Sequence, residues 1–349
     1  MQFRVFKQVP RIIYGNNSIE RVEELLAKEL GKGLVVFDSK VSDLVSKLSL
    51  FGREISFIEF DATDGEPYTH QVDEFVQGLV GSVPVDFIIG IGGGSTMDVA
   101  KSISVCLKNP GESENYQGWD LPRSPGVFKI GIPTIFGSGS EASRTAVLNN
   151  GRKKQGINSD YSMFDGIILD PSLSQSIEIK TKFYTAMDCY IHCVESLEGS
   201  MINQLSKGYA STALAYCYEY FDNGMKNEEL ICVGSYYGGV SIVNSEVGIC
   251  HALSYGLSTE FGFRHGLANC VAFRVLQEYY GDHVLKFEGW LKKYNLKLPE
   301  GVCEKVSSAQ MQRMIDQTCL MERPLTNALG SDWFSILTPE KIRELYSRM

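Results

Sequence analysis

Residues 86–101, which read DFIIGIGGGSTMDVAK, decide the fold of this chain. The stretch opens as a short apolar run, typical of a buried strand, and then passes through three consecutive glycines. Those glycines let the backbone approach an anion closely, and the Ser and Thr that follow can cap a helix. A helix that starts there presents free N–H groups and a positive dipole end to a phosphate. The stretch therefore predicts a strand, a phosphate-binding loop and a helix, although glycines also serve tight turns.

The residues before this stretch alternate between the same two patterns. Helical spacing of apolar residues predicts helices over 18–30, 41–50 and 72–80, with Gly31 placed to end the first. Apolar runs at 33–38 and 55–60 predict buried strands between them. Strands that alternate with helices favour a mostly parallel sheet covered on both faces, which binds ligands at the carboxyl ends of its strands.

Two further features of this half suit a nucleotide. Asp38 ends the strand 33–38, where its carboxylate can accept from both ribose hydroxyls and would repel a 2′-phosphate. As an alternative, Asp38 caps a helix or a turn. A second glycine-rich loop, residues 132–141, carries small hydroxyl side chains that suit a ribose, a phosphate or a nicotinamide amide, but Pro and Gly mark any loop.

Helical patterns dominate after Asp170-Pro171, over residues 183–197, 204–220 and 233–247 and beyond residue 302. We therefore expect an α/β domain followed by an all-α domain. The predicted bounds are residues 1–175 for a Rossmann-like nucleotide-binding domain and residues 176–349 for a helical, metal-binding domain.

The helical half holds a predicted metal site. Asp188 and His192 are four residues apart, so on a helix they lie on one face, as half of a divalent-metal site. The chain has only five histidines, and two more, His251 and His265, lie downstream. We expect a helix to carry His251 and a loop or the next helix start to carry His265. As an alternative, each of these residues taken alone could be part of a surface pair or a hydrogen-bonded polar group of the core. Cys189 and Cys193 flank His192 and suggest a second option, a metal site with thiolate ligands, although buried cysteines are commonly packing residues.

Overall composition excludes several classes of protein. The net charge of −9 disfavours binding to nucleic acid or to an anionic membrane surface. No apolar run is long enough to span a bilayer. Nine cysteines without a repeated CxxC spacing, and no secretory signal at the start, predict reduced thiols in a cytoplasmic protein.

The motifs together resemble the iron-containing (group III) alcohol dehydrogenase family over nearly the whole chain. Residues 92–101 fit its GGGSxxDxAK motif and residues 133–141 its PTTxGTGSE motif. Asp188-x-x-x-His192 fits the first metal motif, with His251 and His265 at the spacing of the other ligands. The resemblance implies a dehydroquinate synthase-like architecture and an enzyme that interconverts alcohols and carbonyls with NAD(P) and a divalent metal.

Carried over by position, the resemblance assigns both cofactor sites. Asp188, His192, His251 and His265 would ligate Fe²⁺ or Zn²⁺. The NAD site would be lined by Asp38, Gly92, Gly93, Gly94, Ser95, Asp98, Thr134, Ser138, Lys154 and Leu173. Asp38 favours NAD over NADP. We also expect a homodimer.

Three departures from the family pattern concern the substrate and its proton. Tyr255 stands where the family commonly has a further histidine, so we assign Tyr255 as the candidate proton relay. Arg264 and Arg144 replace a proline and a small hydroxyl residue, and two arginines suit a carboxylate-bearing substrate. A surface position or a structural ion pair is the alternative for each arginine.

The compact length, the Arg264-His265 junction and the ending RPLTNALG (residues 323–330) resemble a branch of the family that acts on a sugar acid. That resemblance implies oxidation of the C8 primary alcohol of 3-deoxy-D-manno-octulosonate to an aldehyde, leading to an 8-amino sugar of lipopolysaccharide. The electron acceptor, NAD or oxygen, stays open. Alternatives are an NAD-dependent dehydrogenase of a small alcohol, diol or aldehyde, a lyase or cyclase of the dehydroquinate synthase type, and a non-catalytic binding protein.

Overall fold

The computed structural model describes residues 5–27, 31–62, 65–81 and 84–349 of the chain. It divides into two compact units, Met1–Ile177 and Glu178–Met349. The division falls two residues after the boundary expected from the sequence. Each unit is described by itself below.

A six-stranded sheet forms the centre of the first unit. The order is β1-β9-β6-β4-β2-β3, and every neighbouring pair runs parallel. The strands are β1 (Ile12–Tyr14), β2 (Lys32–Asp38), β3 (Glu54–Phe60), β4 (Phe87–Gly92), β6 (Phe128–Pro133) and β9 (Gly166–Leu169). The predicted parallel sheet is confirmed, and β2, β4 and β6 are neighbours with their carboxyl ends at the same edge.

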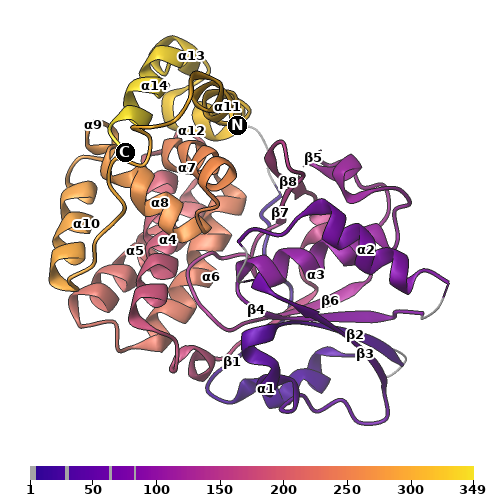
Figure 1. Cartoon of the computed structure of the whole chain (residues 1–349). Coiled ribbons are helices and arrows are strands. Elements are labelled where there is room, and N and C mark those ends of the chain that lie inside the picture. The colour runs from indigo at the N-terminus through magenta and orange to yellow at the C-terminus, as the bar shows by residue number, and fades with distance from the viewer. Residues whose placement is uncertain (1–4, 28–30, 63–64, 82–83) are drawn as a thin grey trace. The chain divides into compact units, whose positions relative to one another are not determined.

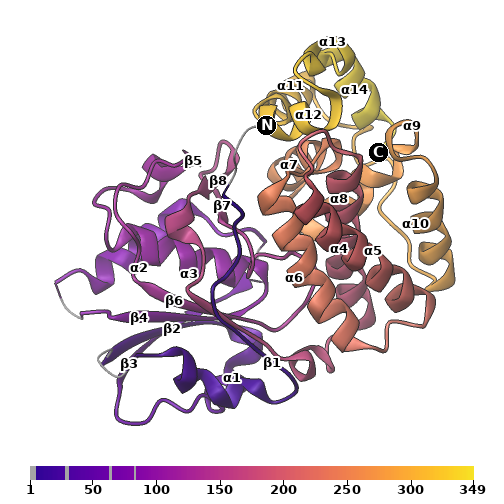
Figure 2. The same ribbon diagram turned by 180° about the vertical axis from the view of Figure 1, so that it is seen from behind.

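Helices cover both faces of this sheet because its central strands are apolar on both sides. Leu34 and Val36 of β2 pack in one cluster with α2 (Thr69–Leu79) and α3 (Gly94–Cys106). The alternate residues Val35 and Phe37 pack in a second cluster with η1 (Ser18–Leu25) and α1 (Ser42–Val45). Figures 1 and 2 show α2 and α3 on one face and α1 on the other.

A small sheet completes this unit, with β8 (Lys154–Asn158) between β5 (Gly118–Trp119) and the antiparallel β7 (Thr145–Asn149). Short 3-10 turns connect the elements: η2 (Ser39–Val41), η4 (Ser113–Tyr116), η5 (Asp160–Ser162) and η6 (Pro171–Ser174).

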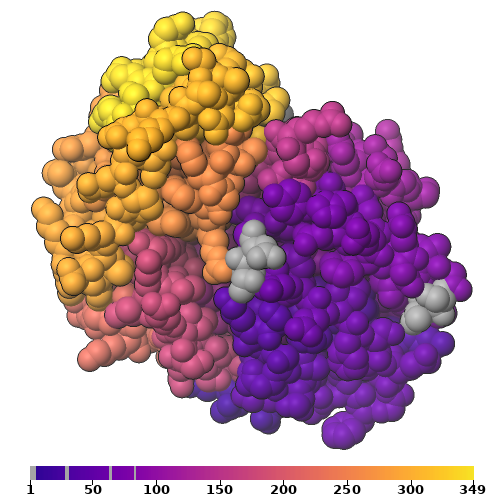
Figure 3. Space-filling view, in the orientation of Figure 1, coloured from indigo at the N-terminus to yellow at the C-terminus, as the bar shows by residue number. Residues whose placement is uncertain are grey.

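The second unit is helical, as expected. Its helices are α4 (Ile179–Glu198), α5 (Gln204–Asp222), α6 (Glu228–Asn244), α7 (Ile249–Phe261), α8 (His265–Arg274), α9 (Gln277–Tyr280), α10 (Asp282–Lys293), α11 (Ser308–Cys319), α12 (Glu322–Leu329), α13 (Trp333–Ile336) and α14 (Pro339–Ser347). The C-terminal residues, coloured yellow, gather at one end of this unit (Figure 3). Helix α4 is buried along most of its length, so its polar residues Asp188, His192 and Glu195 lie inside the unit.

Some predicted elements differ from the structure. The helix expected over 18–30 is a 3-10 segment that ends at Leu25 and is interrupted by non-helical Arg21, and residues 28–30 lie outside the described part of the chain. Of the helix expected over 41–50, only the single turn α1 is helical in the structure. The residues after α1 form a loop that includes Gly52 and leads into β3. Among the described residues, no helix combines the length and the apolar character that crossing a membrane requires.

Candidate metal centre and cofactor loops

Helix α4 supplies the first two predicted ligands. Asp188 and His192 lie one turn apart, and the Nε2 atom of His192 is 3.4 Å from Oδ1 of Asp188. Both side chains are almost fully buried, at 2% and 4% exposed. Polar groups buried this deeply need partners. Asp188 finds them within the site, whereas Nδ1 of His192 has no hydrogen-bond partner among the described residues.

Helices α7 and α8 bring the other two ligands to the same point. Nε2 of His251 lies 3.2 Å from Oδ1 of Asp188, and Nε2 of His265 lies 3.5 Å from Oδ2. Gly262 ends α7 in the left-handed conformation, and α8 then begins at His265, as predicted. A β-carbon on Gly266 would lie 2.5 Å from the carbonyl oxygen of Tyr184, so glycine is what lets the start of α8 lie against α4.

The four residues fit a divalent metal ion. Each offers one ligand atom, and the four atoms lie within 4.8 Å of one another. Three imidazole nitrogens and one carboxylate oxygen are donors that both Zn²⁺ and Fe²⁺ accept. With four protein ligands, Fe²⁺ or a five-coordinate Zn²⁺ would still have a position for the oxygen of a water or a substrate. Only His265 is partly exposed, at 27%, so solvent reaches the group from its side.

The charges in the group give Asp188 and His192, but not His251, the protonation state that a metal ligand needs. Burial alone would raise the pKa of Asp188, but the three histidines outweigh it and hold that pKa well below its usual range. Burial lowers the pKa of His192 to about 4, so this imidazole is neutral at pH 7. Burial also disfavours the charged form of His251, yet the carboxylates of Glu195 and Asp188 raise its pKa to about 9. A metal must therefore displace a proton from His251 when it binds.

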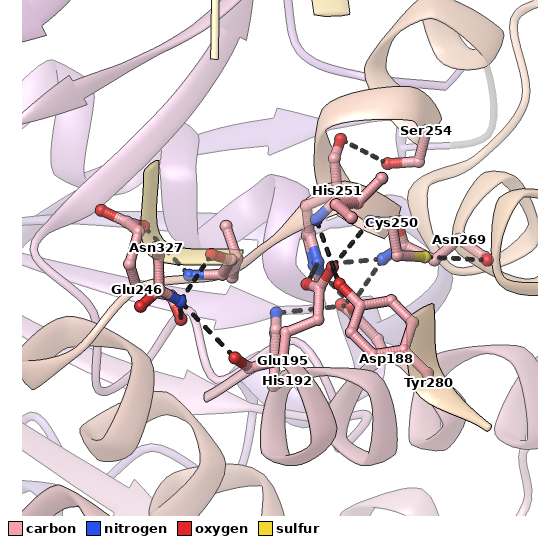
Figure 4. A network of polar contacts seen from close by, with 12 residues as sticks. Asp188, His192, Glu195, Glu246, Cys250, His251, Ser254, Asn269, Tyr280 and Asn327 are labelled. Atoms are coloured by element: carbon pink, nitrogen blue, oxygen red, sulfur yellow. Dashed lines mark hydrogen bonds and ion pairs between the residues drawn. The ribbon is translucent and has the colours of Figure 1, made fainter. Parts of the chain in front are cut away.

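Two buried residues around the ligands were missed from the sequence. The amide of Asn269 donates to Oδ1 of Asp188 at 2.7 Å, and Glu195 accepts a hydrogen bond from Nδ1 of His251 (Figure 4). Glu195 follows Asp188 by seven residues and His192 by three, so its helical phase was a signal that it shares their face. Asn269 lies four residues after His265 and gives the same kind of signal.

The flanking cysteines are packing residues. Sγ of Cys189 donates to the carbonyl of Gly234 at 3.2 Å and lies 3.5 Å from Sγ of Cys217, away from the ligand group. All nine cysteines are free thiols, and burial raises the pKa of Cys193 and Cys250 well above its usual value. Neither flanking cysteine belongs to the group of side chains whose atoms converge as candidate metal ligands.

In the first unit, the predicted cofactor loops lie together at the carboxyl edge of the sheet. Asp38 ends β2 beside the end of β4, where a β-carbon on Gly92 would lie 3.1 Å from that of Asp38. The N–H of Thr134 donates to the carbonyl of Gly92 at 2.9 Å. A β-carbon on Gly94 would lie 2.9 Å from Oγ of Ser138, so the two glycine-rich loops touch.

The start of α3 differs in detail from the expectation. Gly93 is its N-cap and makes no side-chain cap, while Ser95 and Thr96 lie inside the helix. Because no side chain caps this end, the first N–H groups of α3 stay available for an anion. Asp38 itself accepts from the N–H of Lys40 at 2.9 Å, so it also caps the turn η2, the alternative role considered for it.

The other residues assigned to NAD are occupied by contacts within the unit. The carboxylate of Asp98 accepts from the hydroxyl of Ser140 at 2.6 Å and from the N–H of Val147 at 3.0 Å, so Asp98 braces the second loop. Lys154 is 2% exposed and pairs with Glu66 at 2.8 Å. Leu173 is buried in η6, with the cluster that covers one face of the sheet.

The residues assigned to the substrate and the proton separate into two cases. Arg144 pairs with Asp120 and, at 3.0 Å, with Asp160, and it lies over the ring of Trp119, which makes it the structural ion pair named as its alternative. Its contacts give no support to substrate binding. Arg264 is exposed directly before His265, and the ring of Tyr255 lies edge-on to that of His265, with centroids 6.0 Å apart.

Comparison with known proteins identifies the family. Residues 10–171 match the sequence model described as iron-containing alcohol dehydrogenase, and residues 182–320 match the C-terminal model of the same family. The chain belongs to the iron-containing alcohol dehydrogenase family. The two cofactors expected from the sequence, a divalent metal and NAD, agree with this membership and with the Asp/His group of the second unit.

The sequence identity between this chain and individual members of the family is low. A sulfoacetaldehyde reductase of Bilophila wadsworthia (strain 3_1_6) is 34% identical over 54% of this chain and 52% of its own length, so the match spans about half of that relative. An NAD-dependent methanol dehydrogenase of Bacillus methanolicus is 26% identical over 75% of this chain and 72% of its own. A solved iron-containing alcohol dehydrogenase has a TM-score of 0.81 at 26% identity, covering 99% and 98% of the two chains.

Proposed function

We propose that this chain is a metal-dependent, NAD-linked oxidoreductase that interconverts a small alcohol or diol and its aldehyde. The observation that carries the proposal is the convergence of Asp188, His192, His251 and His265 from three helices on one buried point. The glycine-rich loops of the first unit, with Asp38 beside Gly92, support NAD as the partner. Membership of an alcohol dehydrogenase family favours this reaction over a lyase, a cyclase or a non-catalytic role.

The residues of the chain have separable tasks in this reaction. A bound divalent metal supplies the positive charge that favours the alkoxide form of an alcohol, and NAD supplies the hydride acceptor. Asp188 contributes one negative charge against three neutral imidazoles, so the site keeps a net positive charge for the substrate oxygen. Tyr255, beside His265, is our candidate for moving the substrate proton. Asp38 favours the unphosphorylated ribose of NAD.

Among substrates, the observations favour a small molecule over a sugar acid. Arg144 forms ion pairs with Asp120 and Asp160. Of the two arginines, only Arg264 lies next to a predicted metal ligand, His265. The relatives described above are named for sulfoacetaldehyde and methanol, both small. The narrower hypothesis, a Kdo 8-oxidase acting on 3-deoxy-D-manno-octulosonate, rests on resemblance alone.

The test is a turnover assay with purified protein loaded anaerobically with Fe²⁺ or with Zn²⁺. Methanol, ethanol and 1,3-propanediol are offered with NAD⁺, sulfoacetaldehyde is offered with NADH, and the change in NADH absorbance is followed. We expect metal-dependent turnover of at least one of these compounds and its loss in Asp188→Ala and His265→Ala. Turnover that survives in both variants would overturn the proposal.

A parallel incubation with 3-deoxy-D-manno-octulosonate, in air and under nitrogen, tests the narrower hypothesis. Aldehyde formed in air without NAD would establish an oxidase instead. The homodimer stays a prediction, and light scattering of the loaded protein checks it.

A further inference from the structure

Glu195 is a buried carboxylate that neither cofactor motif accounts for. It lies on α4, one turn beyond His192, and is 1% exposed. Burying a carboxylate is costly unless hydrogen bonds and opposite charges compensate. The residues around Glu195 should therefore show which groups its negative charge stabilises.

The partners of Glu195 are all donors. Oε2 accepts from Nδ1 of His251, while Oε1 accepts from the N–H of Cys250 at 2.7 Å and from the hydroxyl of Tyr280 at 3.1 Å (Figure 4). A β-carbon on Gly248 would lie 3.0 Å from Oε1 and 2.8 Å from the Tyr280 hydroxyl. Glycine at position 248 thus leaves room for the carboxylate, which presents two acceptors and no donor.

This arrangement decides which nitrogen of His251 can bind a metal. A neutral imidazole carries one proton, and the hydrogen bond to Glu195 holds that proton on Nδ1. The lone pair is then on Nε2, which points to Asp188 at 3.2 Å. With the proton on Nε2 instead, His251 could not be a ligand through that atom.

We propose that Glu195 is a positioning residue that holds His251 in the tautomer and orientation required for metal binding. This inference rests on the proposed metal centre and deepens it. Carboxylates that accept from a ligating histidine commonly set its tautomer and ring angle, and their loss costs roughly 10–100-fold in metal affinity.

The Glu195→Gln variant is informative because an amide cannot reproduce the contacts. If its oxygen faces His251, its NH₂ group meets the N–H of Cys250, donor against donor. If its NH₂ group faces His251, the imidazole must offer a lone pair at Nδ1 and carry its proton on Nε2. Either arrangement disturbs His251, although the variant keeps the size of the side chain.

Glu246→Gln is the matched control. Glu246 is a less deeply buried glutamate of the second unit, at 14% exposed, that pairs with Arg323 at 2.8 Å and acts on His251 through its charge alone. Removing its charge should alter stability and change the metal affinity much less than Glu195→Gln does. The comparison separates the effect of a lost buried charge from the effect of losing the hydrogen bond to His251.

The experiment is a chelator competition that gives the dissociation constant for Zn²⁺, together with nitrogen NMR of the imidazoles in the Zn²⁺-loaded protein. We expect Glu195→Gln to bind Zn²⁺ about 10–100-fold more weakly than wild type. We also expect it to lose the single Nδ1–H signal of His251. Glu246→Gln should keep that signal and should bind Zn²⁺ with an affinity much closer to that of wild type. Should Glu195→Gln fail to fold, Glu195→Asp retains the charge and should bind more weakly than wild type.

Unchanged Zn²⁺ affinity in Glu195→Gln, with wild type binding normally, overturns the inference and leaves the metal centre standing. Equal weakening in Glu246→Gln also overturns it, because the effect would then be structural. Wild-type protein that binds no divalent metal refutes the proposed function itself, so the two failures are distinguishable.

Discussion

Loading the metal centre should stabilise the helical unit, and Asp188→Asn should abolish that stabilisation. Asp188 is the only anionic residue of the four ligands, and its oxygens lie 3.2–3.5 Å from the three Nε2 atoms. Asparagine keeps the shape of the side chain but removes the negative charge. The perturbation therefore weakens attraction for a cation while it leaves the packing of α4 in place.

The expected magnitude follows from linkage between binding and folding. A metal that binds only the folded state at 100 times its dissociation constant adds about 2.7 kcal/mol to the free energy of unfolding. For a unit the size of Glu178–Met349, each kcal/mol shifts the melting temperature by about 2–4 °C. We therefore expect the transition of this unit to rise by about 5–11 °C when the metal is added.

Differential scanning calorimetry with Zn²⁺ and with a chelator measures this shift. Wild type should show it in the transition of the helical unit, and Asp188→Asn should show less than about 2 °C, which corresponds to under 1 kcal/mol. A shift of equal size in the variant would refute the reasoning, because the stabilising ion would then bind elsewhere.

Three further outcomes are expected in the first unit. Asp38→Asn should bring the dissociation constant for NADP⁺ about tenfold closer to that for NAD⁺, because about 1.4 kcal/mol of repulsion between the carboxylate and the 2′-phosphate is lost. Fluorescence titration with both nucleotides checks this. Gly94→Ala should weaken NAD⁺ binding without changing Zn²⁺ affinity, because the new β-carbon would lie 2.9 Å from Oγ of Ser138. An unchanged NAD⁺ affinity in the same titrations would contradict this prediction. Burial lowers the pKa of Lys101 from 10.5 to about 8, so the unfolded chain holds more protons at this site between these values, and the contribution of Lys101 to stability should rise with pH across that window by up to roughly 3 kcal/mol. Buried thiols such as Cys193, whose pKa is raised, lower the stability of any variant over the same range, so the test is a difference. Denaturant unfolding at pH 8 and pH 10 should show the free energy of unfolding of wild type rising relative to that of the Asp98→Asn/Lys101→Met double variant, and a constant difference would contradict the prediction.

Local patterns in the sequence predicted most of the fold and half of the candidate metal ligands. The apolar run, the three glycines and the helix of residues 86–101 are contiguous, so periodicity alone placed β4, its loop and α3. Asp188 and His192 share a helix face by spacing. His251 and His265 were added because the chain has only five histidines, and the family resemblance supported them, since no spacing rule links positions on two helices that are separated by the turn at Gly262.

Contacts between distant segments could not be predicted. Arg144 pairs with Asp120, which is 24 residues away, and the sequence left open whether this arginine binds a substrate or forms a structural ion pair. The role proposed for Glu195 depends on α7, which places His251, 56 residues later in the chain, against its carboxylate. The 3-10 geometry of η1 is likewise a tertiary outcome, since its apolar spacing suits an α-helix.

X-ray absorption spectroscopy of the Zn²⁺-loaded protein tests the central claim most directly, because it reports the atoms bound to the metal. The account predicts a first shell of nitrogen and oxygen at about 2.0–2.2 Å, with three imidazole ligands, and no sulfur. The His265→Ala variant should lose one imidazole from that shell. Sulfur at about 2.3 Å would contradict the account, since Cys189 or Cys193 would then be a ligand in place of the Asp188 group.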